Sequence, residues 1–414
     1  MRVVMLLGRS TGGIGTHVAE LTAELRLLGD DVVVVTDELT ATRFDLAGAR
    51  RWWPRLRRTS GGSLRETVRN LVRLRQLVRG ADLVHAHGHQ AGLLATLVSA
   101  STGTPVVVSQ HNAVLATRHT QQLVSALVQR VVARHAALVT GASTDLVAQA
   151  SRFGARDSRL APVPSPRVPG LLARPPLTVT GRAELAAELL LKAGVTKGGV
   201  AKGGVAKGGV TTGGVTKGAV TKGGTDSVAA YGVGEYGTPR RIVLTVSRIA
   251  RQKNLETLIA AAALVGEGVS WVVVGDGDDA LLSQYRHEAE RVSAPVHFVG
   301  SVPDPSDWLR AAEVFALPSR WEARALVVQE AMAAGTPVVA SATGGLSDLV
   351  DGAGILVPVG DAAALARSVR DLLEDSQRRG QLSQLGRDRA TSWDDGRSTA
   401  RRWHQWYSAA SSMT

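Results

Sequence analysis

An α/β fold made of two doubly wound domains is the fold class that this sequence predicts, and three observations lead to it. The chain has 414 residues, more than a single hydrophobic core usually supports. Short valine-rich runs alternate with helical stretches, which is typical of parallel sheets covered on both faces. The alternation stops near Pro162 and resumes at Arg240, so the chain divides into two halves.

The N-terminal domain is expected over residues 1–165. Its first strand, RVVMLL, leads into a glycine loop, GRSTGGIG, and then into the helix THVAELTAELRLLG, which ends at Gly29. Further strands are expected at DVVVVT, DLVHAH, TPVVVSQ and AALVTGA, with helices between them. The opening run MRVVMLLG meets glycines at once, so we interpret it as a strand and not as a secretory signal.

A linker is expected over residues 166–239. The segments APVPSPRVPG and ARPPL are rich in proline, and residues 195–224 repeat a five-residue unit, V-[TA]-K-G-G, six times. Glycine disfavours both helix and strand, and one valine in each unit cannot build a core. The repeat is therefore interpreted as a flexible tether, and a charged arm that touches an anionic surface is the alternative.

The C-terminal domain is expected over residues 240–394. Its strands are predicted at RRIVLTVS, SWVVVGDG, PVHFVG, VFALPS, PVVAS and GILVPVG. Helices are predicted at NLETLIAAAALVG and at ALVVQEAMAAG, which ends at Gly335. Residues 395–414 predict a last helix, amphipathic and aromatic, that packs back at the domain junction.

Composition and charge limit the classes of partner and the cellular compartment that are expected for this chain. The chain has a net charge of +12 and no cysteine, which excludes structural disulfides and fits a reducing, cytoplasmic compartment. The segment Arg50–Arg79 contains ten arginines and one acid, together with Trp52 and Trp53. This mixture suits membrane headgroups, so peripheral contact with an anionic membrane, at the inner face of the plasma membrane, is one interpretation and a solvated basic surface is the other. No recognition motif for nucleic acid accompanies the charge, so nucleic acid is not expected as a partner.

Two glutamates, Glu322 and Glu330, lie eight positions apart around the apolar helix ALVVQEAMAAG. Glu322 is expected in the loop after the strand VFALPS, at the edge where open α/β sheets bind ligands. A carboxylate accepts hydrogen bonds from sugar hydroxyls, and the free N–H groups at a helix start suit phosphate oxygens. The pair therefore indicates a site for a sugar diphosphate, and a capping glutamate beside an incidental one is the alternative.

Two cations accompany the glutamates in the stretch VSRIARQKN. Arg248 directly follows a strand and Lys253 lies at the start of a helix, so both are expected to point into the same crevice. Fixed cations there would stabilise the charge that develops on a nucleoside diphosphate leaving group. Two solvated surface cations are the alternative.

At this point a family resemblance becomes visible. The stretches SRIARQKNLETLI, GDGDD, FVGSVPD, ALPSRWE, EAMAAGTPVVAS and TGGLSDLVDGAGILVPVGD follow one another, after GGIGTHVAEL and LVHAHGHQAG in the first half. In these motifs the chain resembles glycosyltransferase family 4, retaining enzymes of the GT-B fold, over nearly its whole length apart from the repeat. The resemblance implies two Rossmann-like domains facing a cleft. It also implies transfer of a sugar from a nucleoside diphosphate sugar to a hydroxyl of a carbohydrate or lipid-linked acceptor, with a donor phosphate oxygen as the base.

The same resemblance implies a role for each matching residue. Four would be catalytic: Arg248 and Lys253 on the donor diphosphate, Glu322 on the transferred sugar, and His87 near the reacting sugar. The other donor-binding residues would be Glu330 at the ribose, Val302 at the base, Gly13 and Gly15 in the loop facing the diphosphate, and Gly344 and Gly345, whose backbone N–H groups would lie near the phosphates. No cofactor and no obligatory metal are expected.

The chain departs from the family at Ala323-Arg324-Ala325, where glycines usually follow the first glutamate. Arg324 is expected either to bind a phosphate or an acidic sugar of the donor, or to pair with Glu322 and block it. A smaller departure is Asp348, where glutamate is more frequent. Two alternatives therefore stay open: a catalytically impaired nucleotide-sugar-binding protein of the same fold, and a sugar-nucleotide epimerase.

Three further patterns suggest other chemistry. The DGD stretch Asp276–Asp278 resembles a metal-binding motif of the other large glycosyltransferase fold, but we interpret it as a turn after a strand. His85, His87 and His89 alternate, which suggests zinc on one strand face, yet no cysteine or acid nearby in the sequence completes such a site. The GGIG loop with Asp37 suggests a nicotinamide cofactor, but the charged residues of the second domain do not suit hydride transfer.

Overall fold

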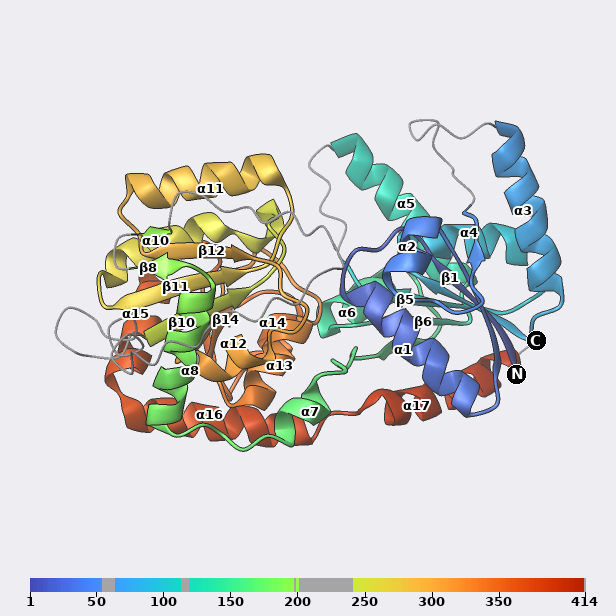
Figure 1. Cartoon of the computed structure of the whole chain (residues 1–414). Helices are drawn as coiled ribbons and strands as arrows, with labels where there is room; N and C mark the ends of the chain where they lie inside the picture. Colours follow the sequence, from blue (N-terminus) through green and yellow to red (C-terminus); the bar gives the residue numbers. More distant parts are fainter. Residues whose placement is uncertain (54–63, 113–118, 197–198, 201–240, 413–414) are drawn as a thin grey trace, which may run out of the picture.

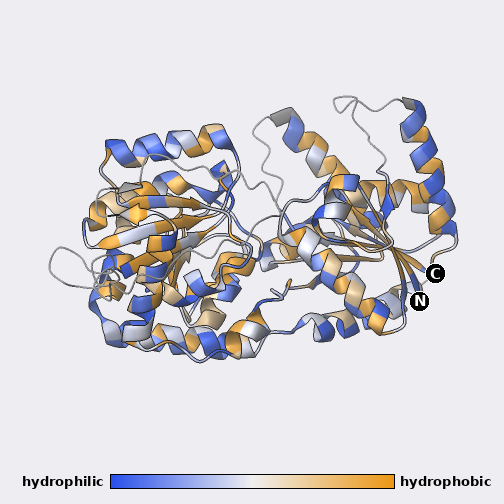
Figure 2. Ribbon diagram, viewed as in Figure 1, coloured by the Kyte–Doolittle hydropathy of each residue, from blue (hydrophilic) through white to orange (hydrophobic). Residues whose placement is uncertain are grey.

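The computed structural model describes residues 1–53, 64–112, 119–196, 199–200 and 241–412 (Figure 1). The described residues form two parallel sheets, each covered by helices, and the two resulting domains lie side by side. Apolar residues are concentrated on the strands, whereas many outward-facing helix residues are hydrophilic (Figure 2). The predicted α/β fold of two doubly wound domains is confirmed.

The first sheet has seven described strands in the order β3-β2-β1-β4-β5-β6-β7. Valines and leucines alternate between its two faces: Val3 and Met5 join one core cluster, and Val4 and Leu6 join the other. The strands are β1 (Arg2–Leu7), β2 (Asp31–Thr36), β3 (Arg50–Arg51), β4 (Leu83–His87), β5 (Val106–Gln110), β6 (Leu138–Gly141) and β7 (Ser158–Leu160). The helices are α1 (Gly13–Leu27), α2 (Glu38–Arg43), α3 (Leu64–Arg79), α4 (His89–Ser99), α5 (His119–His135) and α6 (Thr144–Arg152).

The second sheet has six described strands in the order β12-β11-β10-β13-β14-β15, and all of them are parallel. These strands are β10 (Arg241–Val246), β11 (Val269–Val274), β12 (Val296–Gly300), β13 (Val314–Leu317), β14 (Val338–Ser341) and β15 (Ile355–Val357). The helices are η2 (Arg251–Lys253), α10 (Leu255–Val265), α11 (Asp279–Arg291), α12 (Ser306–Ala311), α13 (Leu326–Ala334), α14 (Gly345–Val350), α15 (Ala362–Glu374) and α16 (Ser376–Thr391). Helix α13 ends at Gly335, whose φ of 76° is in the left-handed region, as the sequence predicts.

Both sheets reverse their strand order beside the first strand of the domain. In the first sheet β1 lies between β2 and β4, and in the second β10 lies between β11 and β13. Ligands of open α/β sheets bind outside the carboxyl ends of the strands at such a reversal. The loops that follow β1, β4, β10 and β13 therefore contain the positions where a site is expected.

The linker expected over residues 166–239 is wrong for its first part. Helices α7 (Val168–Leu172) and α8 (Val179–Lys192) occupy that part and pack on the C-terminal domain. Leu171, Ala186 and Leu190 are buried in the core of that domain. The leucines of α8 recur at helical spacing, so the helix buries an apolar face in spite of the prolines that precede it.

The start of the repeat also differs from the expectation. Strands β8 (Val195–Thr196) and β9 (Gly199–Val200) pair antiparallel, and the Val195 side chain is only 4% exposed. Burial of this first valine against the C-terminal core explains why the chain is ordered here despite its glycines. The rest of the repeat, over residues 201–224, lies outside the described residues, so the predicted tether and the alternative charged arm both stay predictions.

The last helix, α17 (Gly396–Ser411), belongs to the N-terminal domain although it follows the C-terminal one. In Figure 1 the chain passes from α16 below one domain to α17 below the other. Trp403 and Tyr407 are buried in the core of the N-terminal domain, against α1 and the first sheet. His404 Nδ1 lies 2.8 Å from Asp30 Oδ2, which further joins the two ends of the chain. The chain thus crosses the domain junction twice, once after β7 and once before α17.

The arginine-rich segment is only partly described. Trp52 and Trp53 pack against the N-terminal core, so these two side chains are not free to insert elsewhere. Helix α3 carries exposed arginines together with the exposed side chains of Val68 and Val72, and residues 54–63 lie outside the described part. Within the described ranges, no helix has the length and apolar character needed to cross a membrane. The contact with an anionic membrane stays a prediction.

Candidate active site

Two oppositely charged side chains at the carboxyl edge of the second sheet form a nearly buried pair. Lys253 Nζ donates a hydrogen bond of 2.6 Å to Glu322 Oε1, and the two side chains are 12% and 11% exposed. Gln252 Nε2 donates to the Trp321 carbonyl oxygen at 2.6 Å, which holds η2 against the loop after β13. The ammonium compensates the burial of the carboxylate, so this loop tolerates an acid in an apolar setting.

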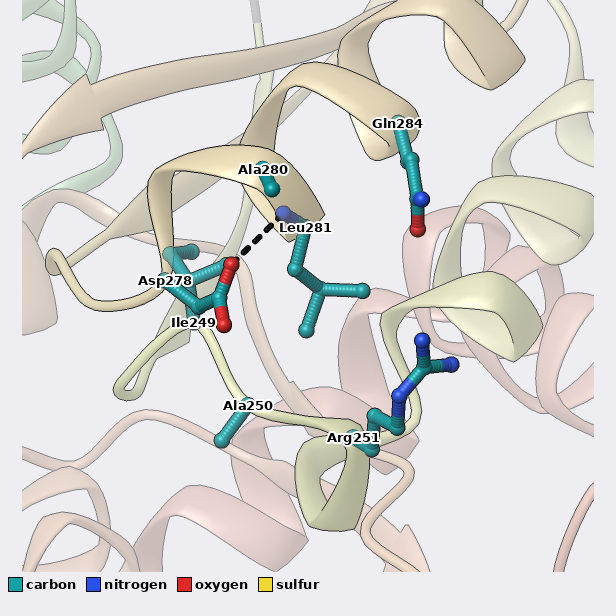
Figure 3. Close-up of a pocket in the computed structure, with 7 residues that line it drawn as sticks. All are labelled: Ile249, Ala250, Arg251, Asp278, Ala280, Leu281 and Gln284. Atoms are coloured by element: carbon teal, nitrogen blue, oxygen red, sulfur yellow. Dashed lines mark hydrogen bonds between the residues drawn. The ribbon is translucent and has the colours of Figure 1, made fainter.

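Arg248 follows β10 at the same edge of the sheet. Its side chain is exposed, and among the described residues its guanidinium takes part in no ion pair and no hydrogen bond. A guanidinium without an acidic partner is available to an anionic ligand. Beside this loop, a hollow of about 360 Å³ lies between η2 and α11 (Figure 3), lined by Ile249, Ala250, Arg251, Asp278, Ala280, Leu281 and Gln284.

Glu330 is held on one side only. It lies on α13 and is 1% exposed, and its Oε1 accepts hydrogen bonds from Ser165 Oγ at 2.6 Å and from Arg167 Nη1 at 3.3 Å. Its Oε2 is buried, and no described residue donates to it. Burial raises the pKa of the Glu330 carboxyl, while the bonds from Ser165 and Arg167 oppose that rise. The arrangement leaves one buried acceptor oxygen for a ligand that brings hydroxyl groups.

The loop that was predicted to meet the base lies next to the same arginine. Val302 is partly buried against the C-terminal core. Directly after it, the Pro303 carbonyl oxygen accepts a bond from Arg167 Nη2 at 3.2 Å, and the Asp304 carboxylate lies 3.5 Å from Arg167 Nε. Sequence reasoning missed Ser165 and Arg167, and the only signal was the alternation PSPR within a segment interpreted as linker.

Gly344 and Gly345 pack against the Glu322 loop, and the predicted contact of the Gly344 N–H with the phosphates stays a prediction. The Gly345 N–H donates to the Glu322 carbonyl oxygen at 2.9 Å, so it is not free for a phosphate. A Cβ on Gly344 would lie 2.2 Å from that same oxygen, and one on Gly345 would lie 1.6 Å from the Ala323 carbonyl oxygen. The two glycines allow α14 to approach the backbone of the Glu322 loop closely. This packing helps to fix the position of the Glu322 carboxylate.

Gly13 and Gly15 lie in the first turn of α1 and not in a loop. A Cβ on Gly13 would lie 3.2 Å from Leu326 Cδ1, so the start of α1 faces the start of α13 across the domain junction. Gly15 is buried and accommodates Phe44, whose Cε2 would lie 2.1 Å from a Cβ at this position. Gly13 therefore faces the other domain, its predicted contact with the diphosphate stays a prediction, and the absent side chain of Gly15 makes room for Phe44.

Arg324 neither blocks nor pairs with Glu322. Its guanidinium lies over the ring of Trp393, 5.4 Å from the centroid, and Glu322 is paired with Lys253. Burial lowers the pKa of Arg324 to about 10, and the charge of Asp348 partly opposes this. The alternative in which Arg324 pairs with Glu322 and blocks it is wrong, because Glu322 is paired with Lys253 and the Arg324 guanidinium lies over the Trp393 ring. Its predicted contact with the donor stays a prediction.

His87 belongs to a cluster of four buried histidines. Its ring stacks on His111 at 5.4 Å, and His87 Nδ1 lies 3.1 Å from His111 Nε2. His17 on α1 and His85 on β4 complete the cluster. His87 Nε2 is buried, and no partner for it is present among the described residues. Sequence reasoning missed His17 and His111, although one follows the glycine stretch and the other follows β5.

The histidine cluster is neutral near pH 7. Burial lowers the pKa of His17 to about 4 and that of His111 to about 3. Burial, followed by the neighbouring histidines, holds the pKa values of His85 and His87 well below their usual range. A neutral imidazole at His87 acts as a hydrogen-bond donor or acceptor toward a ligand, not as a cation.

Acid is expected to destabilise the protein through this cluster. Between pH 6.5 and about 4 the unfolded chain binds a proton at His17 that the folded chain does not bind, so stability falls by about 1.4 kcal/mol per pH unit for this residue. Urea unfolding at pH 7.5, 6.0 and 5.0 measures the slope. His17→Gln should flatten it, and the exposed His135→Gln should not. An unchanged slope in His17→Gln would contradict the burial argument.

Helix α6 of the N-terminal domain contacts the loops that carry Glu322 and Gly345. Trp321 Nε1 donates to Asp145 Oδ2 at 3.0 Å, and Asp348 Oδ2 accepts from Thr144 Oγ1 at 2.7 Å. Ala323 is buried with Leu146 in a small shared cluster. The candidate site thus lies at the junction of the two domains, and Asp348 joins them.

The described side chains do not assemble a metal site. Among them, no group of three or more histidines or acids is placed to hold an ion. Asp278 Oδ1 accepts from the Leu281 N–H at 2.9 Å as the N-cap of α11, which agrees with the turn interpretation of DGD. His85 bonds Tyr407 and Ser109 with its two ring nitrogens, so it does not converge with His89 on one ion.

Both domains match models of known protein families. Residues 12–166 match the model described as Glycosyl transferase 4-like domain, and residues 235–389 match the model described as Glycosyl transferases group 1. The chain is 35% identical over 164 residues to the D-inositol 3-phosphate glycosyltransferase of Xylanimonas cellulosilytica, covering 37% of this chain and 39% of that protein. It is 32% identical over 149 residues to the lipopolysaccharide core biosynthesis glycosyltransferase LpsE of Rhizobium meliloti, covering 36% and 44%. These alignments span about two fifths of the length of the curated relatives.

Solved structures share the fold over the whole chain. The complex of Anabaena Alr3699/HepE with UDP has a TM-score of 0.75 at 19% identity and covers 99% of this chain and 100% of that one. Sucrose-phosphate synthase of Thermosynechococcus elongatus has a TM-score of 0.72 at 21% identity and covers 100% of both chains. At these identities the similarity shows the fold alone, two Rossmann-like domains of the GT-B type.

Proposed function

Because the chain belongs to the glycosyltransferase family whose two domain models it matches, we propose that it transfers a sugar from a nucleoside diphosphate sugar to a hydroxyl of an acceptor. One observation carries the proposal. The buried pair of Lys253, on η2 after β10, and Glu322, on the loop after β13, lies at the carboxyl edge of the second sheet, and the half-satisfied carboxylate of Glu330 is on the helix that follows this loop. This combination suits a ligand with a diphosphate between two hydroxyl-bearing groups.

The donor diphosphate is bound by Lys253 and Arg248 in this proposal. The exposed guanidinium of Arg248 has no acidic partner among the described residues, and Lys253 has two further N–H donors beside the one that Glu322 uses. Cations fixed at this edge stabilise the charge that develops on the leaving diphosphate. The UDP present in the HepE structure supports a nucleoside diphosphate as the ligand of this fold.

Glu322 and Glu330 grip the two ends of the donor. Glu322 accepts a hydrogen bond from a hydroxyl of the transferred sugar, and the Gly345 N–H fixes the Glu322 backbone by donating to its carbonyl oxygen. Glu330 offers Oε2 to the ribose hydroxyls, which satisfies an otherwise unpaired buried oxygen. His87, a neutral donor or acceptor in the N-terminal domain, faces the sugar with Nε2. The acceptor binds on the N-terminal side and is a carbohydrate, either free or linked to a lipid.

We infer that transfer retains the anomeric configuration. The bond between the sugar C1 and the phosphate oxygen breaks, a bond from C1 to the acceptor oxygen forms on the same face, and the hydroxyl proton moves to the leaving phosphate oxygen. Glu322 is bound to an ammonium at 2.6 Å, which disfavours a role as a nucleophile. The fixed cations supply the charge that a metal would supply elsewhere, so no metal is required in this scheme.

A thermal-shift screen against UDP-, GDP- and ADP-sugars tests the proposal. A ligand at a hundred times its Kd stabilises the native state by about 2.7 kcal/mol and raises the melting temperature. One donor class is expected to produce this rise. Turnover of that donor should persist in EDTA, and NMR should show that the product keeps the anomeric configuration of the donor. Binding without turnover would identify the catalytically impaired alternative, and conversion of the donor without acceptor would identify the epimerase. No shift with any donor would contradict nucleotide-sugar binding.

A further inference from the structure

Ser165 and Arg167 lie in the segment that joins the two domains, and they contact the face of the C-terminal domain where the nucleoside is proposed to bind. Ser165 is 2% exposed and donates to Glu330 Oε1, and Arg167 donates to the same oxygen. The carboxylate is therefore anchored through one oxygen by two donors. With Oε1 fixed in this way, the carboxylate cannot rotate freely, and the lone pairs of Oε2 keep a fixed orientation.

Arg167 also connects Glu330 to the loop that follows β12. Its Nη2 donates to the Pro303 carbonyl oxygen at 3.2 Å, and its Nε lies 3.5 Å from Asp304 Oδ1. One guanidinium thus joins α13 to the loop after β12. Because Arg has donors in a planar fork, it can bind these groups at the same time and fix their separation.

The rest of the segment is fixed to the same helix. Gln329 Nε2 donates to the Val163 carbonyl oxygen at 2.9 Å, and Val168 and Leu171 of α7 are buried against α13 and its neighbours. Prolines at 162, 164 and 166 restrict the backbone on both sides of Ser165. The segment is therefore a rigid support, and its two polar side chains are aimed at Glu330.

We propose that Ser165 and Arg167 are positioning residues that aim Glu330 Oε2 at the ribose, and that they thereby make the site selective for ribonucleotides over 2′- and 3′-deoxynucleotides. The inference rests on the proposed function, since it concerns the nucleoside end of the same donor site. It assigns part of this site to the crossing segment between the domains. A carboxylate held in one orientation discriminates strongly, because a missing hydroxyl leaves its buried oxygen unpaired.

The test compares the Kd values of the nucleoside diphosphate with those of its 2′-deoxy and 3′-deoxy analogues by calorimetry. The wild type is expected to favour the ribonucleotide by roughly tenfold or more. Ser165→Ala and Arg167→Ala should reduce this ratio toward one, and Arg167→Lys should restore part of it. The matched control is Arg174→Ala, which removes an exposed arginine paired with Asp307 at 3.2 Å in the same region and should leave the ratio unchanged.

The outcomes separate this inference from the proposed function. If the wild type binds no nucleoside diphosphate, both are overturned. If it binds one but does not discriminate against the deoxy analogues, or if Ser165→Ala and Arg167→Ala discriminate as the wild type does, only the positioning role is overturned. Arg167 is 42% exposed, and Arg167→Lys keeps a cation beside the buried Glu330, so the comparison stays informative even where an alanine variant unfolds.

Discussion

Lys253→Ala is expected to abolish the rise in melting temperature that a nucleotide sugar produces, and to lower donor turnover by roughly 10²–10³-fold. The ammonium of Lys253 lies 2.6 Å from Glu322 Oε1 in a nearly buried pair. Its loss removes a cation from the proposed diphosphate site and also leaves the Glu322 carboxylate without its partner. Thermal-shift and turnover measurements with the donor found by the screen give both results.

The stability of the variant needs its own control. Removing one partner of a buried ion pair costs about 3–5 kcal/mol, because the other charge stays buried and uncompensated. The double variant Lys253→Ala/Glu322→Gln removes that charge, so it should recover much of the stability and still fail to bind the donor. Lys192→Ala, which breaks an exposed pair with Glu188, should change neither property. A full donor shift in Lys253→Ala would contradict the placement of the diphosphate.

Trp403→Ala is expected to lower the free energy of unfolding by about 3–5 kcal/mol. The side chain is 2% exposed and fills the N-terminal core from the C-terminal helix. Its ring lies 4.5 Å from His85 and 5.6 Å from Tyr407, measured between centroids. Its removal leaves a cavity between α17 and the first sheet. Urea unfolding, monitored by circular dichroism, would measure the resulting loss of stability.

Trp406 supplies the matched control for that experiment. It lies on the same helix but is only partly buried, beside Arg159, whose guanidinium is 5.6 Å from its ring centroid. Trp406→Ala should therefore cost clearly less than Trp403→Ala, and Trp403→Phe should recover part of the loss. Equal losses in the two alanine variants would show that α17 does not anchor in the core as described.

Much of the candidate site in the second domain could be predicted from local sequence. A short apolar run, a loop with Glu322 and an apolar helix that ends at Gly335 are patterns within one stretch, and the structure has them in that order. The direction of parallel strands then places the loops after β10 and β13 at one edge. These steps depend on neighbours in sequence and on general rules of sheet topology.

The partners of each charged group could not be predicted in the same way. The sequence places both Arg324 and Lys253 within reach of Glu322, and only the structure shows that Lys253 pairs with it while Arg324 lies over Trp393. Glu330 finds Ser165 at a distance of 165 residues along the chain. Such pairs depend on tertiary packing, about which local propensity and spacing contain no information.

Helices α7 and α8 show a different cause of error. Their prolines and the glycine repeat that follows suggested a linker, and these signals concern the backbone alone. The leucines of α8 and the burial of Leu171 and Leu190 decide the outcome, because apolar surface buried on the C-terminal domain outweighs the poor local propensity.

The two passages of the chain across the domain junction constrain how the halves can move. Two domains connected by one segment of backbone can rotate relative to each other about any axis. Two connections restrict this rotation mainly to a hinge axis that passes through both of them. Both connections contact the stretch that includes the two glutamates, one through Ser165 and the other through Trp393 under Arg324. A movement of the two domains about this axis would therefore displace the same few side chains that we propose bind the donor.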